Sequence, residues 1–246
     1  MWRKALGLVL RSVQYKETDC ILTVLTAENG LMTLKARGVR RNSSTLKGAC
    51  QLLTYSEFTI SEIRGFQNIT EATAIEMFPE LRMDIELLAL ASYFAQLAET
   101  LSQQDAPDPA LLPLTLNALY ALSKLHKKPR LVKAALELRM ACLAGYEPQL
   151  DGCTVCSSAE PDRFCVSDGV LACASCLVSD GVHLPVSPPS LAAMRYIISC
   201  DDRKLFSFDL TGAAEKELCD AAETYLLTQL ERGFSTLDFY KSLALR

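Results

Sequence analysis

Short apolar runs separated by polar residues characterise the first 80 residues. Short runs rich in Leu, Val, Ile and Thr occupy residues 5–10, 20–25, 31–36, 54–61 and 68–74. Asn29-Gly30 lies between the second and third runs and is typical of a tight hairpin turn, because both residues tolerate a positive φ. Five short strands with no helix-length pattern between them predict a small barrel, and a five-stranded OB-type barrel fits this count. The count alone leaves an SH3-like barrel open.

From Pro79 onward the apolar positions recur with the 3.6-residue period of a helix. Leu87, Ala91, Phe94 and Ala98 form one apolar stripe, and further helices are expected at about residues 110–125 and 130–144. Helices resume at about residues 191–200 and 213–232, beyond an irregular segment. The chain is therefore expected to be an α+β protein. Residues 1–80 would form the OB-fold, DNA-binding domain, and residues 81–246 an all-α helical domain.

Four of the ten cysteines form two pairs of identical spacing in the irregular segment. They are Cys153-x2-Cys156 and Cys173-x2-Cys176. Two residues between thiolates allow one turn to direct both sulfurs at one ion, and two such turns complete a tetrahedral site that suits Zn²⁺. We expect one structural zinc ion per chain, held by an inserted zinc-knuckle or ribbon element at residues 151–180 with a hairpin turn at Asp168-Gly169. The alternative is a reduced cysteine cluster without metal.

Formal charge is unevenly distributed along the chain. The whole protein carries −4, but residues 1–50 contain nine Lys and Arg against three acidic residues, a net of +6. This asymmetry indicates an anionic partner for the first segment. Four cations lie close together in one predicted loop: Arg37, Arg40, Arg41 and Lys47. Because guanidinium and ammonium groups bind phosphate oxygens, this loop predicts a groove for a nucleic-acid backbone.

Platforms on which bases could stack are less evident. Five aromatic side chains of the predicted barrel are candidates, and we expect most of them to pack in the core: Trp2, Tyr15, Tyr55, Phe58 and Phe66. Electrostatic contacts are therefore expected to dominate the interface.

Catalytic motifs are absent from the sequence. It has two histidines and no HExxH, GxxxxGK[ST], GxGxxG or GxSxG segment. Four cysteine ligands would also leave zinc without an open position for a reactive water. We predict that the protein is not an enzyme; a zinc-dependent hydrolase or nuclease is the alternative. The sequence contains no run of about 18 apolar residues, so no membrane span is predicted. The N-terminus lacks the form of a signal peptide, and we therefore expect a cytoplasmic protein.

Three stretches resemble the RecO family of bacterial recombination mediators in their order and separation. They are Tyr15-Lys16-Glu17-Thr18-Asp19 with Asn29-Gly30, the basic segment from Lys35 to Leu46, and Gly145-Tyr146-Glu147-Pro148-Gln149-Leu150-Asp151-x-Cys153-x-x-Cys156. Together these motifs are specific, and the resemblance covers about residues 1–176.

The resemblance implies an N-terminal OB-fold, a helical domain with the zinc element inserted, and DNA repair without catalysis. It implies binding of single- and double-stranded DNA, annealing of complementary strands, and work with RecR to load RecA onto DNA coated by the single-strand-binding protein SSB, close to the nucleoid. The DNA-binding residues carried over are Lys35, Arg37, Arg40, Arg41 and Lys47. A rival function is a zinc-containing protein-interaction adaptor that binds nucleic acid only weakly.

The resemblance also implies that the acidic C-terminal tail of SSB is bound. Residues 124–139 carry a net charge of +5. Arg130, Lys133 and Arg139 lie along a predicted helix whose other face is apolar, so we expect these three cations to receive the tail. The alternative is that they are ordinary solvated cations near helix ends.

Overall fold

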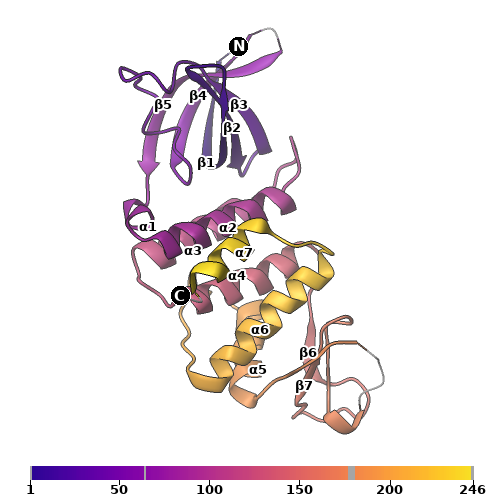
Figure 1. Cartoon of the computed structure of the whole chain (residues 1–246). Helices are drawn as coiled ribbons and strands as arrows, with labels where there is room; N and C mark the ends of the chain where they lie inside the picture. The colour runs from indigo at the N-terminus through magenta and orange to yellow at the C-terminus, as the bar shows by residue number, and fades with distance from the viewer. Residues whose placement is uncertain (1, 64, 177–180, 245–246) are drawn as a thin grey trace. The chain divides into compact units, whose positions relative to one another are not determined.

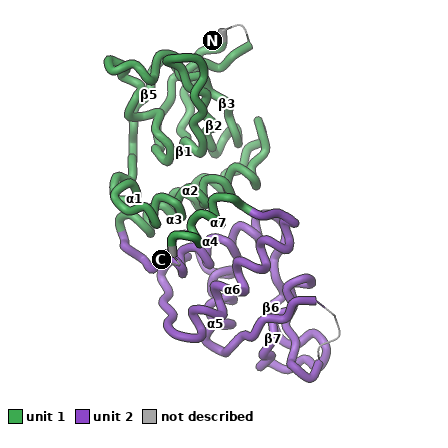
Figure 2. Tube along the Cα trace, viewed as in Figure 1, with its two compact units in different colours: residues 1–124, 234–246 green, residues 125–233 purple. Residues whose placement is uncertain are grey.

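The computed structural model of the chain describes residues 2–63, 65–176 and 181–244 (Figure 1). Residues 177–180, the last four of the predicted zinc element, lie outside the described residues. The chain folds into two compact units. Unit 1 consists of Met1–Lys124 together with Phe234–Arg246, and unit 2 of Leu125–Gly233 (Figure 2).

A closed five-stranded barrel forms the first part of unit 1. Its strands are β1 (Trp2–Tyr15), β2 (Asp19–Thr26), β3 (Gly30–Ala36), β4 (Tyr55–Ile63) and β5 (Phe66–Glu76). They follow the order β1-β2-β3-β5-β4 around the barrel, and β3 pairs with β5 in parallel to close it. This confirms the OB-type barrel, and the five predicted runs coincide with these strands except for Thr54, which directly precedes β4.

The barrel core explains why these runs become strands. Alternate residues point inward, and their apolar side chains, including Leu22, Val24, Phe58 and Ile60, are almost fully buried. The segment between β3 and β4 contributes Val39, Leu46 and Cys50 to the same core. The basic loop is therefore anchored to the barrel by its own apolar residues.

Four helices complete unit 1. They are α1 (Pro79–Met83), α2 (Ile85–Leu101), α3 (Leu111–Ser123) and α7 (Ser235–Ala244). Asp84 caps α2, since its carboxylate accepts hydrogen bonds from the backbone N–H groups of Glu86 and Leu87. The pattern of apolar positions predicted α2 and α3, but the prediction ended the last helix at residue 232 and missed α7.

Unit 2 combines three helices with a small sheet. The helices are α4 (Pro129–Leu143), α5 (Pro188–Ser199) and α6 (Gly212–Gln229), with short 3-10 turns η1 (Ala174–Cys176) and η2 (Asp202–Lys204). The strands β6 (Gln149–Cys153), β7 (Arg163–Cys165), β8 (Val170–Ala172) and β9 (His183–Pro185) lie in the order β6-β8-β7-β9. The predicted hairpin is the antiparallel pair β7 and β8.

The change from strands to helices falls between Glu76 and Pro79, close to the proposed domain boundary at residue 80. The compact units, in contrast, divide at Lys124, because α1, α2, α3 and α7 group with the barrel. None of the helices in the described residues has the length and apolar character needed to cross a membrane.

Candidate nucleic-acid interface and metal centre

A groove of about 340 Å³ lies on the outer surface of the barrel. Aromatic and cationic side chains line it together with Ile21 of β2, Thr33 of β3 and Gln67 of β5. The full lining is Tyr15, Lys16, Ile21, Thr33, Lys35, Arg37, Phe66 and Gln67. We call it the aromatic groove. Lys35 faces outward because its neighbours Leu34 and Ala36 occupy the inward positions of β3.

Lys35 is held in place by two contacts. Its Nζ lies 3.4 Å from Asp19 Oδ2 and 4.6 Å from the centroid of the Tyr15 ring. The backbone N–H of Gly38 donates to Asp19 Oδ1 at 2.8 Å. This hydrogen bond, and then Lys35, lower the pKa of the Asp19 carboxyl, so it remains a carboxylate. Arg37 is exposed and has no ionic partner among the described residues.

Further bonds join the basic loop to the turn between β1 and β2. The backbone N–H of Arg40 donates to the carbonyl of Thr18 at 3.0 Å, and Arg40 Nη1 donates to the carbonyl of Glu17 at 2.9 Å. Gly38 has φ +64, a conformation that other residues rarely adopt, and Arg41 is exposed beside it. The loop therefore has a defined shape that fixes where its cations emerge.

A second groove, of about 650 Å³, lies elsewhere on unit 1 and shares no lining residue with the first. We call it the loop groove. Arg40 and Lys47 line it together with Arg82 from α1 and polar residues such as Ser12 and Gln51. The structure thus divides the predicted DNA-binding residues, with Lys35 and Arg37 in one groove and Arg40 and Lys47 in the other.

The expectation that most aromatic residues pack in the core is wrong. Phe58 is fully buried, but Trp2 is 68% exposed, Phe66 64% and Tyr15 39%. Trp2 and Tyr15 are the first and last residues of β1, and Phe66 is the first residue of β5. The alternation of directions along a strand places Trp2 on the face opposite to the buried Ala5.

Four thiols come together in unit 2. The sulfur atoms of Cys153, Cys156, Cys173 and Cys176 all lie within 4.8 Å of one another. Cys153 ends β6, Cys173 follows β8, and Cys176 ends η1, so the sheet brings the two pairs to one point. The distance from Cys156 Sγ to Cys173 Sγ is 3.7 Å. Tetrahedral zinc with sulfur at about 2.3 Å separates its ligands by about 3.8 Å, which this spacing matches.

The surroundings shift the pKa values of these thiols in opposite directions. Backbone N–H groups, that of Cys156 foremost, lower the pKa of the Cys153 thiol to about 6. Burial and hydrogen bonds from neighbouring thiols raise the pKa of Cys173 to about 12. A dication at the centre would displace these protons and satisfy all four sulfurs. Closed four-sulfur coordination stabilises a fold and leaves no site for substrate.

Two further candidate ligands lie outside this cluster. Cys165 is buried, and its sulfur lies 3.2 Å from His183 Nδ1, across the pairing of β7 with β9. The four-thiol group is the set of potential metal ligands found in the described parts of the chain, and neither residue belongs to it.

The three cations expected to receive the SSB tail do not converge. Lys133 is buried, and its Nζ lies 2.8 Å from Glu137 and 2.7 Å from Glu223. Burial opposes its charged form, but these two carboxylates outweigh it and raise the pKa of Lys133. Arg139 donates to the carbonyl of Cys200 at 2.6 Å and pairs with Asp202. Of the three, Arg130 is exposed.

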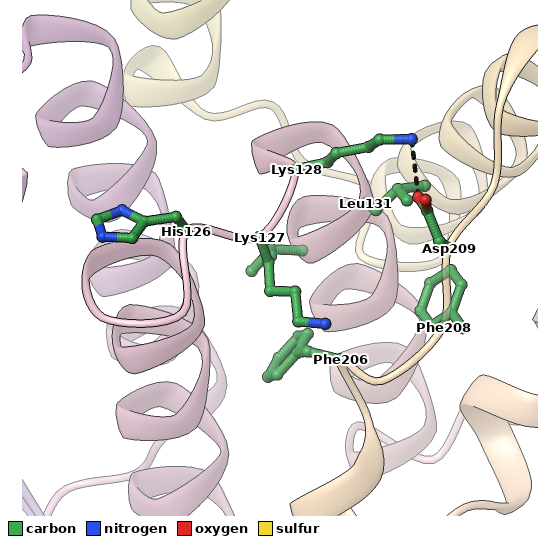
Figure 3. Close-up of a pocket in the computed structure, with 8 residues that line it drawn as sticks. His126, Lys127, Lys128, Leu131, Phe206, Phe208 and Asp209 are labelled. Carbon is green, nitrogen blue, oxygen red and sulfur yellow. Dashed lines mark ion pairs between the residues drawn. The ribbon is translucent and has the colours of Figure 1, made fainter.

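A separate pocket of about 230 Å³ lies at the start of α4 (Figure 3). Apolar side chains of Leu131, Phe206 and Phe208 line it, and Lys127 and Lys128 stand at its edge. Lys128 reaches Asp209, with Nζ 2.7 Å from the carboxylate. Lys127 has no ion pair among the described residues and lies beside the ring of Phe206 in Figure 3. We call it the α4 pocket.

Family comparisons cover almost the whole chain. The family model described as Recombination protein O N terminal matches residues 1–78, and that described as Recombination protein O C terminal matches residues 82–238. The chain belongs to the RecO family. Its relatives include the DNA repair protein RecO of Acetivibrio thermocellus, 32% identical over 98% of this chain and 96% of that protein. Another is the DNA repair protein RecO of Caldicellulosiruptor saccharolyticus, 28% identical over 97% of each.

Membership of the RecO family assigns the chain a role in recombination and DNA repair. The family resemblance expected from the sequence is confirmed. The two candidate sites of this RecO-family chain are the cationic surface of the barrel in unit 1 and the four-thiol cluster in unit 2.

Proposed function

We propose that this RecO-family chain binds single- and double-stranded DNA, anneals complementary strands, and works with RecR to load RecA onto DNA coated by SSB. It would act at the nucleoid in the cytoplasm, without catalysis of its own. The observation that carries the DNA-binding part is the aromatic groove, where exposed Tyr15 and Phe66 lie next to Lys35 and Arg37.

The chemistry of the groove fits a single strand. Aromatic rings stack on bases of any sequence, and cations beside them contact phosphates. Of its three cations, Lys35 is paired with Asp19. Lys16, in the turn after β1, and Arg37, directly after β3, have no ion-pair partner among the described residues. Annealing in this proposal is electrostatic, because basic side chains replace counterions along two strands and hold them close enough to pair.

The test is fluorescence anisotropy of a labelled single strand, titrated at several salt concentrations. The double variant Arg40→Ala/Arg41→Ala should bind more weakly, and the slope of log affinity against log salt should flatten by about 1.4. Arg203→Ala/Lys204→Ala, which removes two exposed cations of η2 in unit 2, is the charge-matched control. If both double variants behave like the parent protein, the DNA site lies outside the basic loop.

We further propose that Cys153, Cys156, Cys173 and Cys176 hold one structural zinc ion. The support is the mutual proximity of four sulfurs at distances that suit tetrahedral coordination. The ion would fix the small sheet of unit 2 and take no part in a reaction.

The SSB tail is the second proposed partner. Arg130, Lys133 and Arg139 were its expected site, and the burial of Lys133 between two carboxylates favours the α4 pocket as an additional docking point. An acidic tail with an aromatic end matches apolar walls beside Lys127, whereas Lys128 is already paired with Asp209. A labelled tail peptide should lose affinity for Arg130→Glu and for Lys127→Glu. If both variants bind it as tightly as the parent, the tail docks elsewhere.

A further inference from the structure

Annealing requires two strands to be held at once, and unit 1 has two grooves. We propose that the barrel binds two DNA strands together, the first by bases and phosphates in the aromatic groove and the second by phosphates alone in the loop groove. This inference rests on the proposed function. It adds a division of labour, in which the second strand keeps its bases free for pairing.

The two grooves carry equal charge. Lys16, Lys35 and Arg37 line the aromatic groove, and Arg40, Lys47 and Arg82 line the loop groove. Neither lining includes an acidic residue among the described parts of the chain. Each groove therefore attracts a polyanion without needing the other.

In each groove, two of the three cations are available to phosphates. Lys35 is engaged with Asp19. Arg82 donates to the backbone carbonyls of Met77 and Leu52 and to Thr54 Oγ1. It therefore adds positive charge to the loop groove but has few N–H groups left for a phosphate. Lys47 is exposed, and Arg40 uses one guanidinium nitrogen on Glu17 and keeps its other donors.

The grooves differ in what they offer to bases. The aromatic groove presents the rings of Tyr15 and Phe66, on which bases can stack. Among the described residues, none that lines the loop groove is aromatic, and its apolar walls include Val39, Leu52 and Leu88. A strand in the loop groove would be held through its backbone, so its bases would stay unstacked from the protein.

The basic loop connects the two grooves in a fixed geometry. Arg37 precedes Gly38 and Arg40 follows it, so the turn at Gly38 separates the cations of one groove from those of the other. Bonds from Gly38 to Asp19 and from Arg40 to Thr18 hold this turn against the barrel. Two backbones would therefore be kept at a constant separation.

Native mass spectrometry with oligonucleotides of about eight nucleotides, within the range of one OB-fold site, can count strands on the full chain. We expect two per chain. Tyr15→Ala/Phe66→Ala should weaken binding at the aromatic groove about tenfold, so that one strand remains, in the loop groove. Arg40→Gln/Lys47→Gln should also leave one. Arg203→Gln/Lys204→Gln, the matched control, should keep both.

Annealing rates of complementary labelled strands supply the second readout. Both groove variants should anneal more slowly, and Arg40→Lys/Lys47→Arg should restore the rate because it keeps both charges. An abasic oligonucleotide should still bind the loop groove but lose affinity for the aromatic groove. One strand per chain, abolished by either groove variant, would mean a single continuous site and overturn the inference. No binding of any oligonucleotide would instead overturn the proposed function itself.

Discussion

Gly30 has two structural roles, one in a hairpin turn and one in the packing of the barrel against the helical part of unit 1. Its φ of +58 suits the Asn29-Gly30 hairpin that the sequence predicts. In the folded chain it also lies against the segment after α2, where Leu31 donates to the carbonyl of Gln103 at 3.0 Å. A Cβ at Gly30 would lie 2.2 Å from the carbonyl oxygen of Ala106, far inside contact distance. The barrel and the helices of unit 1 meet at this glycine.

Gly30→Ala should therefore lower the free energy of unfolding by about 2 kcal/mol or more, from the left-handed backbone and the displaced carbonyls. Gly65→Ala, with φ +77 and open space around it, should cost only about 1 kcal/mol. Gly48→Ala, with neither constraint, should change stability by less than about 0.5 kcal/mol. Urea unfolding followed by circular dichroism ranks the three. Equal stability of all three variants would contradict the close approach at Gly30.

Among the elements, the small sheet of unit 2 is the one that we expect to need a bound metal ion for its stability. Strands β7, β8 and β9 have three residues each. Strands this short form only when something else fixes their ends, and the four-thiol cluster joins the end of β6 to the segment after β8. Metal binding energy would then be folding energy for this sheet.

The purified protein should contain about one zinc ion per chain. Cys153→Ser and Cys176→Ser should each lose most of the metal and lower the melting temperature. Cys165→Ala, which removes the thiol outside the cluster, should retain zinc. Elemental analysis and thermal unfolding give the two measurements. A fully folded parent protein without detectable metal would show that the thiols stabilise the sheet unaided.

On the scale of the whole molecule, the end of the chain returns to unit 1. Phe234 is 1% exposed, and its ring meets that of Tyr93 edge-on, with centroids 5.6 Å apart. Thr236 Oγ1 donates to Gln96 Oε1 at 2.5 Å on the same helix α2. Unit 1 is thus built from both ends of the sequence. Residues 1–80, proposed as the DNA-binding domain, supply most of the residues that line the two grooves.

Phe234→Ala should lower the stability of unit 1 by about 3 kcal/mol, since it leaves a cavity against α2. Phe239→Ala is the matched control on α7, because that side chain is 52% exposed and should change stability by less than about 0.5 kcal/mol. Chemical unfolding of the two variants makes the comparison. If Phe234→Ala is no less stable than Phe239→Ala, α7 does not contribute to the folding of unit 1.

The sequence by itself determined the features that depend on neighbours along the chain. Short apolar runs marked the five strands, the 3.6-residue period marked α2 to α6, and the spacing of Cys153, Cys156, Cys173 and Cys176 marked a candidate metal site. Each of these is a local regularity, so it can be read from a short window of residues. The basic loop was visible for the same reason.

Only the tertiary structure decided which side chains are free to act. It exposed Trp2, Tyr15 and Phe66 at the ends of strands, and it buried Lys133 of α4 against Glu223 of α6, 90 residues away. It also assigned Arg37 and Arg40, three residues apart, to different grooves. Exposure and ion pairing depend on which surface a distant element covers, and no periodicity along the chain encodes that covering.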